Sequence, residues 1–248
     1  MTPRGTSFGR RAEDYERARP EYPPEALDLA VLRLELGPDA EVLDVGAGTG
    51  KLTRPLVERF RRVTAVEPDP GMRAVLTRAT EAYRVLEGRA EAIPLPDDSV
   101  DAVFAGESFH WFDAGPALEE MARVLRPRGG VAVIWKHWWE TEPPLPEAAA
   151  RVLQRAFERP DLERDAANRD WRAAFQASPF GELREDELVS DPMTLDGNDL
   201  VTLMLTTSIM VSLPPEELAD VDRELRTLVV GEYRLPIKSG LCTTRLTG

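Results

Sequence analysis

Three glycines follow an apolar run in the first quarter of the chain, and this segment limits the possible folds more than any other. It reads Val42-Leu43-Asp44-Val45-Gly46-Ala47-Gly48-Thr49-Gly50. The apolar residues predict a buried strand over 41–45, and Leu52, Leu56 and Phe60 recur at helical spacing after the glycines. A strand, a glycine turn and a helix open a β-α-β unit, in which the free N–H groups of the helix N-terminus can bind a ligand.

Short apolar runs and helical patterns alternate along most of the chain, which predicts a parallel sheet with helices on both faces. We expect further strands at 62–67, 83–86, 100–105, 131–135, 184–189 and 237–246, and further helices at 24–36, 70–79, 113–125, 198–211 and 215–231. Residues 126–130 are expected to form a turn, and Asp113 is expected to cap the N-terminus of the helix at 113–125. The predicted fold class is α/β: a Rossmann-like, doubly wound, mostly parallel seven-stranded sheet with a helical substrate cover.

We expect one domain over residues 1–248. Its predicted parts are an N-terminal helical segment (1–38), a ligand-binding core (39–136), a helical cover (137–232) and a closing strand (233–248). The cover is expected to contain the strand near 184–189. Residues 137–180 and 196–232 depart from the β-α alternation, and we expect them to set the choice of substrate.

Composition narrows the classes of partner. Lys and Arg number 31 against 44 Asp and Glu, a net charge of −13, which disfavours nucleic acid and leaves a small molecule as the expected partner. No apolar run is long enough for a membrane span, and residues 1–19 lack the apolar centre of a signal peptide, so a cytoplasmic location is expected. The only cysteine is Cys242 and the only histidines are His110 and His137, so neither a disulfide nor a metal site is expected.

Glu67 ends the second predicted strand, 21 residues after Gly46. An acidic side chain at about this distance binds ribose hydroxyls in dinucleotide folds, and neighbouring strand ends would place it beside the glycine turn. Asp44 precedes the turn, where its carboxylate can hold the loop amides or, through water, a ligand ammonium. Glycines also make ordinary turns, but the loop, the acid and the flanking periodicity together predict a nucleoside-type ligand.

Four segments carry a family resemblance. Residues 43–50 resemble motif I of the class I methyltransferases, and Val66-Glu67-Pro68-Asp69 resembles their motif II. Residues 88–95 with 99–101 are similar to the segment that wraps the adenine, and residues 125–130 to the turn before the fifth strand. The small-molecule branch, which includes ubiquinone and menaquinone methyltransferases, is the most similar group. Within it, residues 15–23 and 109–112 favour the trans-aconitate side.

The resemblance covers residues 8–136 well and implies S-adenosylmethionine as the cofactor and a small-molecule methyl acceptor. The cofactor-binding residues that it implies are Tyr15, Arg19, Asp44, Gly46, Ala47, Gly48, Glu67, Pro68, Met72, Ala90, Glu91 and Gly106. Gly46 and Gly48 would line the methionine and ribose parts, and Glu67 would bind the ribose hydroxyls. Pro68 and Met72 would lie against the adenine, with Ala90 and Glu91 at its edge.

Two parts of this assignment leave alternatives open. Tyr15 and Arg19 either cap the carboxylate of the cofactor or belong to a solvated, charged helix face. Many relatives have an acidic residue at the position of Arg89, where it accepts from the adenine amino group. Arginine cannot accept a hydrogen bond, so Glu91 or backbone groups would take that role.

His110 is the candidate catalytic residue, because it follows the strand at 100–105, at the edge where open α/β sheets bind ligands. It acts as a general base or a hydrogen-bond donor to the substrate, or it packs on Trp111 and orders the loop. Trp135 alternates with Val133 and is predicted to lie in the core. Trp138 and Trp139 are expected either to cover an apolar substrate or to pack in the core, and Arg172 and Arg234 are further candidates for binding an acidic substrate.

Three functions remain in view. The first is a small-molecule methyltransferase. The second is a nicotinamide-dependent oxidoreductase, which the early third glycine disfavours, because dinucleotide folds carry Gly-x-Gly-x-x-Gly. The third is a protein that binds S-adenosylmethionine without catalysis.

Overall fold

The computed structural model of the chain describes residues 12–79, 84–136, 145–158 and 171–247. The strands are β1 (Glu41–Val45), β2 (Arg62–Val66), β3 (Arg84–Leu86), β4 (Val100–Gly106), β5 (Leu125–Lys136), β6 (Arg184–Asp196) and β7 (Glu232–Arg245). The helices are α1 (Ala12–Ala18), α2 (Pro24–Arg33), α3 (Thr53–Arg59), α4 (Pro70–Ala79), α5 (Ala114–Val124), α6 (Glu147–Phe157), α7 (Trp171–Gln176), α8 (Gly197–Leu205), α9 (Ser208–Val211) and α10 (Pro215–Leu228). A 3₁₀ turn, η2 (Phe109–Trp111), follows β4.

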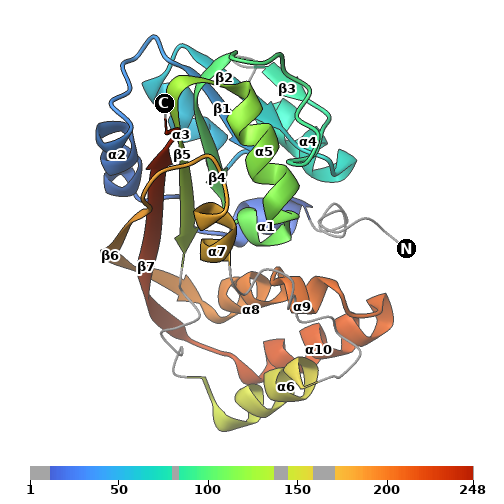
Figure 1. Cartoon of the computed structure of the whole chain (residues 1–248). Helices are drawn as coiled ribbons and strands as arrows, with labels where there is room; N and C mark the ends of the chain where they lie inside the picture. Colours follow the sequence, from blue (N-terminus) through green and yellow to red (C-terminus); the bar gives the residue numbers. More distant parts are fainter. Residues whose placement is uncertain (1–11, 80–83, 137–144, 159–170, 248) are drawn as a thin grey trace.

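The strands form one sheet in the order β3-β2-β1-β4-β5-β7-β6 (Figure 1). Strands β1 to β5 pair in parallel, whereas β7 is antiparallel to both β5 and β6. The prediction of a mostly parallel, Rossmann-like, seven-stranded sheet is therefore confirmed.

The central strands divide their side chains between two cores, because successive residues of a strand point to opposite faces. Leu43 and Val103 pack in a cluster with residues of α5 on one face. Val42 and Phe104 pack in a second cluster with residues of α2 and α3 on the other face. Helices on both sides thus fix the central strands, and with them the sheet edge where β1, β2, β4 and β5 end.

A second layer is built on the far ends of β6 and β7. Helices α6, α8, α9 and α10 gather there, below the main sheet in the view of Figure 1. Leu203, Leu225 and Leu235 belong to its buried cluster, and Ala18 joins the same cluster from α1. The N-terminal helix therefore links this layer to the main sheet. Within the described ranges, no helix has the combined length and apolarity that crossing a membrane requires.

The two C-terminal strands are longer than the sequence predicted, at 13 residues for β6 and 14 for β7. The predictions of strands at 184–189 and 237–246 were wrong in length. Their pairing runs from Arg184 opposite Thr243 to Asp196 opposite Glu232. β6 is an edge strand with no fully buried residue, and its register shifts between Ser190 and Met193, which interrupts the alternation by which a strand is recognised in sequence.

The predicted single helix at 198–211 is wrong, because Thr206 and Thr207 separate α8 from α9. The Thr206 hydroxyl donates to the carbonyl of Leu203 at 2.7 Å, and the Thr207 hydroxyl donates to that of Met204 at 2.9 Å. Such side-chain bonds to the preceding turn compete with helix continuation.

The predicted turn at 126–130 lies inside β5 instead. Leu125 pairs with Val100, the register then shifts, and the ladder resumes where Gly130 pairs with Ala102. The segment is thus an irregularity of the β4–β5 pairing. The helices predicted to end at 36 and 231 end at Arg33 and Leu228, and Asp113 occupies the N-cap of α5 without a side-chain capping bond.

Candidate active site

A cavity of about 640 Å³ lies at the carboxyl ends of β1, β2, β4 and β5. This is the edge where open α/β sheets bind ligands, and the volume is within the range of small-molecule sites. Every residue predicted to bind the cofactor lines the cavity: Tyr15, Arg19, Asp44, Gly46, Ala47, Gly48, Glu67, Pro68, Met72, Ala90, Glu91 and Gly106. His110 lines it as well.

The glycine turn adopts the conformation that its sequence requires. Gly46 and Gly48 have φ angles of 67° and 59°, in the left-handed region that glycine adopts without steric cost. A Cβ atom at Gly46 would lie 2.7 Å from the Cβ of Ser108. The N–H of Gly46 donates to the carbonyl of Val66 at 2.8 Å, so the turn is tied to the end of β2.

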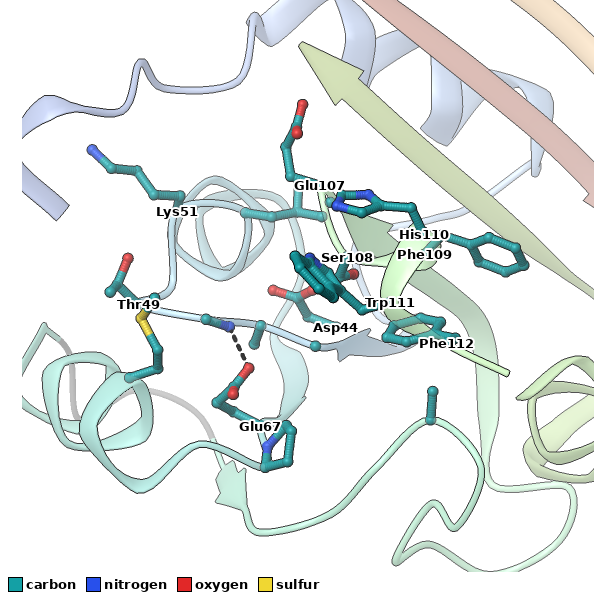
Figure 2. Close-up of a pocket in the computed structure, with 18 of the residues that line it drawn as sticks. Asp44, Thr49, Lys51, Glu67, Glu107, Ser108, Phe109, His110, Trp111 and Phe112 are labelled. Carbon is teal, nitrogen blue, oxygen red and sulfur yellow. Dashed lines mark hydrogen bonds between the residues drawn. The ribbon is translucent and has the colours of Figure 1, made fainter. Parts of the chain in front are cut away.

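The Glu67 carboxylate is fixed by two backbone N–H groups. One oxygen accepts from the N–H of Gly48 at 2.8 Å (Figure 2), and the other accepts from the N–H of Asp69 at 2.8 Å. Each oxygen keeps acceptor capacity for a ligand hydroxyl, because a carboxylate has about four acceptor positions. Burial raises the pKa of Glu67 to about 7, although these two hydrogen bonds act to lower it.

Asp44 has a different partner from the one expected. Its carboxylate accepts from the hydroxyl of Thr53 in α3 at 2.6 Å, and it holds none of the loop amides that the sequence suggested. Its Oδ1 atom is buried without a hydrogen-bond partner among the described residues, as is Oγ1 of Thr49. Burial raises the pKa of Asp44 to about 7. Two cavity-lining side chains therefore hold polar atoms that a ligand can satisfy.

The helix α1 and the residue that follows it place Tyr15 and Arg19 on the cavity. Nε and Nη2 of Arg19 donate to the hydroxyl and the carbonyl of Thr206 at 3.0 and 2.8 Å. The guanidinium also lies over the Tyr15 ring, 5.1 Å from its centroid. Arg19 is only 8% exposed, so the alternative of a solvated helix face is wrong for this residue.

Glu91 and Arg89 meet at the cavity wall beyond β3. Oε2 of Glu91 is 3.3 Å from Nε of Arg89, and Oε1 accepts from the backbone N–H of Asp113 at 2.8 Å. Met72 and Ala90 are buried beside them. Glu91 is thus held between two donors, and its binding to a ligand stays a prediction.

Aromatic side chains form the wall after β4 and β5. Figure 2 shows His110 and Trp111 turned toward the middle of the site, with Phe109 turned away from it. The His110 and Trp111 rings are 5.2 Å apart, so His110 both faces the cavity and packs on Trp111. Trp135 was predicted to lie in the core. It packs against the core cluster but is only partly buried, and it also lines the cavity, with its ring centroid 4.9 Å from that of Trp171.

Sequence reasoning missed a further set of lining residues. They are Tyr22, Thr49, Lys51, Leu52, Glu107, Ser108, Trp171, Thr207 and Ile209. Glu107 and Ser108 directly follow β4, and that position was a usable signal. Trp171, Thr207 and Ile209 come from the second half of the chain and reach the site only through the tertiary fold.

Arg172 and Arg234 do not line the cavity. Arg172 pairs with Glu185 at 2.5 Å and Arg234 lies exposed on β7, so neither supports the proposed binding of an acidic substrate. Trp138 and Trp139 lie outside the described residues. Within the described ranges, no three His, Cys, Asp or Glu side chains are arranged to hold a metal ion.

Comparison with known proteins gives a consistent result. Residues 43–133 match the family model for a methyltransferase domain. An uncharacterized methyltransferase of Mycobacterium tuberculosis is 50% identical over 131 residues, which span 52% of this chain and 51% of that protein, about half of its length. An uncharacterized methyltransferase-like protein of Schizosaccharomyces pombe is 34% identical over 88% of this chain and 84% of its own length. The YcgJ protein of Bacillus subtilis, whose crystal structure is solved, has the same fold, with a TM-score of 0.56 at 18% identity over 90% of this chain and 99% of its own.

The raised pKa values predict how stability changes with pH. Asp44 titrates near 3.8 when unfolded and at about 7 when folded, so the folded chain binds more protons between these values and loses stability as pH rises through them. Asp44→Asn removes this loss, because the amide oxygen can still accept from Thr53. We expect the unfolding free energy of the variant, measured with urea, to gain roughly 2–3 kcal/mol on that of the wild type between pH 5 and 8.

Asp28→Asn is the matched control, because it neutralises an exposed carboxylate on α2. Its unfolding free energy should follow the wild-type pH dependence. Parallel pH curves for Asp44→Asn and the wild type would contradict the assignment of a high pKa to Asp44.

Proposed function

The chain belongs to the class I S-adenosylmethionine-dependent methyltransferases, and from this premise we propose that it transfers a methyl group from S-adenosylmethionine to a small-molecule acceptor and releases S-adenosylhomocysteine. The observation that supports this most is the Glu67 carboxylate, fixed on the cavity by the N–H groups of Gly48 and Asp69. Two further residues of the same cavity each have a buried oxygen, Oδ1 of Asp44 and Oγ1 of Thr49, that has no hydrogen-bond partner among the described residues.

The residues present fit S-adenosylmethionine by charge. The ribose hydroxyls and the α-ammonium of this cofactor are hydrogen-bond donors, and Glu67 and Asp44 offer acceptors. When bound, S-adenosylmethionine supplies an electrophilic methyl group on a positively charged sulfur. A dinucleotide would instead bring a doubly charged pyrophosphate against two buried carboxyls, which disfavours the nicotinamide-dependent alternative.

We assign the parts of the cavity accordingly. Glu67 would hold the ribose hydroxyls, with Pro68 and Met72 against the adenine and Ala90 and Glu91 at its edge. The glycine turn, with Ala47 and Gly106, would lie along the methionine part. Arg19 would hold the α-carboxylate while it stays bound to Thr206, because a guanidinium has five N–H donors and two of them point to Thr206.

The chain's own contribution to rate is positioning and exclusion of water. Tyr15 of α1 and Arg19, directly after α1, line one side of the cavity, and Trp111, Trp135 and Trp171 line another. A fixed alignment of donor and acceptor supplies much of the acceleration in a two-reactant transfer. His110 would accept a proton from the acceptor atom where that atom carries one, or donate a hydrogen bond to orient it.

Residues 137–180 and 196–232 are proposed as the cover that sets acceptor choice. Trp171, Thr207 and Ile209 support this, because they bring this part of the chain onto the cavity. Replacing this region with that of a relative should change acceptor preference and keep affinity for S-adenosylhomocysteine. Retention of acceptor preference after the exchange would contradict the role of the cover.

Titration calorimetry with S-adenosylmethionine, S-adenosylhomocysteine and NAD tests the proposal. The first two should bind and NAD should not. Glu67→Ala should weaken S-adenosylhomocysteine binding by about 2–3 kcal/mol, because charge-assisted hydrogen bonds to the ribose are lost. Glu58→Ala, which removes an exposed carboxylate on α3, is the control and should bind as the wild type does. Binding of NAD alone would refute the proposed function, and unchanged affinity in Glu67→Ala would remove Glu67 from the site.

The variant His110→Phe tests whether His110 transfers a proton or only packs on Trp111. Phenylalanine keeps a ring against Trp111 but has no nitrogen. If His110 handles a proton, turnover of an acceptor found by screening with labelled methyl donor should fall about 100-fold or more. Affinity for S-adenosylhomocysteine should stay unchanged. Wild-type turnover in His110→Phe would leave His110 with a packing role only.

A further inference from the structure

The side of the cavity away from Glu67 is walled by flat aromatic rings. Trp135 at the end of β5 and Trp171 in α7 are 4.9 Å apart with their planes tilted by 40°. Trp111 lies on the same cavity with His110 packed on it. The three indoles come from three separate segments and are all only partly buried, so part of each ring system is available to a ligand. Such rings bind planar apolar groups by stacking and edge-to-face contact.

Charge on the cavity wall is unfavourable for an acidic ligand. The basic lining residues are Arg19, Lys51 and Arg89, and the acidic ones are Asp44, Glu67, Glu91 and Glu107. Lys51 and Arg89 already pair with carboxylates: the ammonium of Lys51 is 2.8 Å from a carboxylate oxygen of Glu21, and Arg89 pairs with Glu91. Arg19 donates to the neutral Thr206 and is assigned above to the carboxylate of the cofactor, so it does not serve the acceptor. An acceptor with several carboxylates would therefore meet more anions than cations.

Glu107 lines the cavity directly after β4, two residues before the aromatic turn η2. It has a φ of 52°, a left-handed conformation that is strained for a non-glycine residue and that often marks functional positions. Its Oε1 accepts from the backbone N–H of Lys136, which fixes the side chain. In Figure 2, Glu107 and Glu67 lie well apart, with Trp111 between them in this view.

The ammonium of Lys136 forms no salt bridge with this carboxylate, although burial lowers the pKa of Lys136 to about 7 and the charge of Glu107 acts against that lowering. It donates to the carbonyl of Pro20 and lies 4.0 Å from the centroid of the Tyr22 ring. Lys136 is 2% exposed and does not line the cavity. Within the described part of the chain, Glu107 forms no salt bridge and only its Oε1 accepts a hydrogen bond, so its Oε2 can accept from a donor on a ligand.

We propose that the methyl acceptor is a planar aromatic compound that carries an O–H or N–H donor and no cluster of carboxylates, with Glu107 binding the donor and the indoles of Trp111, Trp135 and Trp171 binding the ring. This inference rests on the proposed function and narrows it to a substrate class. It disagrees with the trans-aconitate side of the family, which the segments at 15–23 and 109–112 resemble, because Lys51 and Arg89 of the described wall already pair with carboxylates and Arg19 is assigned to the cofactor.

Two ligands with the same ring and opposite charge test the proposal. The protein is saturated with S-adenosylhomocysteine, and tryptamine, indole-3-propionate and trans-aconitate are each titrated by calorimetry. Tryptamine should bind about tenfold or more tightly than indole-3-propionate, and trans-aconitate should give no binding heat at millimolar concentration. Equal or tighter binding of either carboxylated probe would overturn the proposal, as would the absence of tryptamine binding.

Variants of Glu107 test whether its carboxylate causes the preference for tryptamine. Glu107→Gln should weaken tryptamine binding about tenfold and leave affinity for S-adenosylhomocysteine unchanged. Glu119→Gln, which neutralises an exposed carboxylate on α5, should change neither. Glu107→Asp serves as a second variant if the glutamine variant folds poorly, and its shorter side chain should also weaken tryptamine binding. A Glu107→Gln protein with wild-type tryptamine affinity would remove Glu107 from acceptor binding.

The proposed function and the aromatic acceptor can be contradicted separately. Failure of the wild-type protein to bind S-adenosylhomocysteine would contradict the proposed function itself. Normal binding of S-adenosylhomocysteine together with a preference for carboxylated probes would leave the methyltransferase proposal standing and overturn the aromatic acceptor alone.

Discussion

The hydrogen bond from the Gly48 N–H to the Glu67 carboxylate is the contact on which the rest of the site depends. It joins the turn after β1 to the end of β2, which the parallel register brings together by pairing Val45 with Val66. The bond fixes a carboxylate that is otherwise buried at some cost, and burial raises its pKa to about 7. The Glu67 carboxylate therefore lies buried on the cavity wall, and Oδ1 of Asp44 on the same wall has no hydrogen-bond partner among the described residues. This arrangement favours a ligand that presents hydrogen-bond donors or a positive charge.

The two ends of the cavity differ in chemistry, and different parts of the chain build them. The β1–β2 end is polar and uses backbone N–H groups and carboxylates. The other end is aromatic and combines the ends of β4 and β5 with α7, α9 and Thr207 of the α8–α9 connection, so the second layer of the fold reaches the site. The bond between Arg19 and Thr206 ties the N-terminal helix to that layer. Cofactor binding and acceptor choice can therefore vary independently within the same sheet.

Local patterns sufficed to predict the parallel strands, the glycine turn and the position of Glu67, because each depends on spacing within one β-α-β unit. Tertiary contacts decided what could not be predicted. β6 is an edge strand whose length comes from pairing with β7, and Trp135 faces the cavity because α7 covers only part of its ring. Asp44 binds Thr53, nine residues further along the chain, and nothing in the motif distinguishes that partner from the loop amides.

The most direct test of the central claim is the number of protons released when S-adenosylhomocysteine binds at pH 7. With the pKa values of Asp44 and Glu67 both at about 7, each carboxyl is about half protonated in the free protein, and a ligand that presents hydroxyl and ammonium donors favours the ionised forms. Calorimetry in buffers of different ionisation enthalpy should therefore give a release of up to about one proton. Proton uptake, or a binding enthalpy that does not depend on the buffer, would contradict the account.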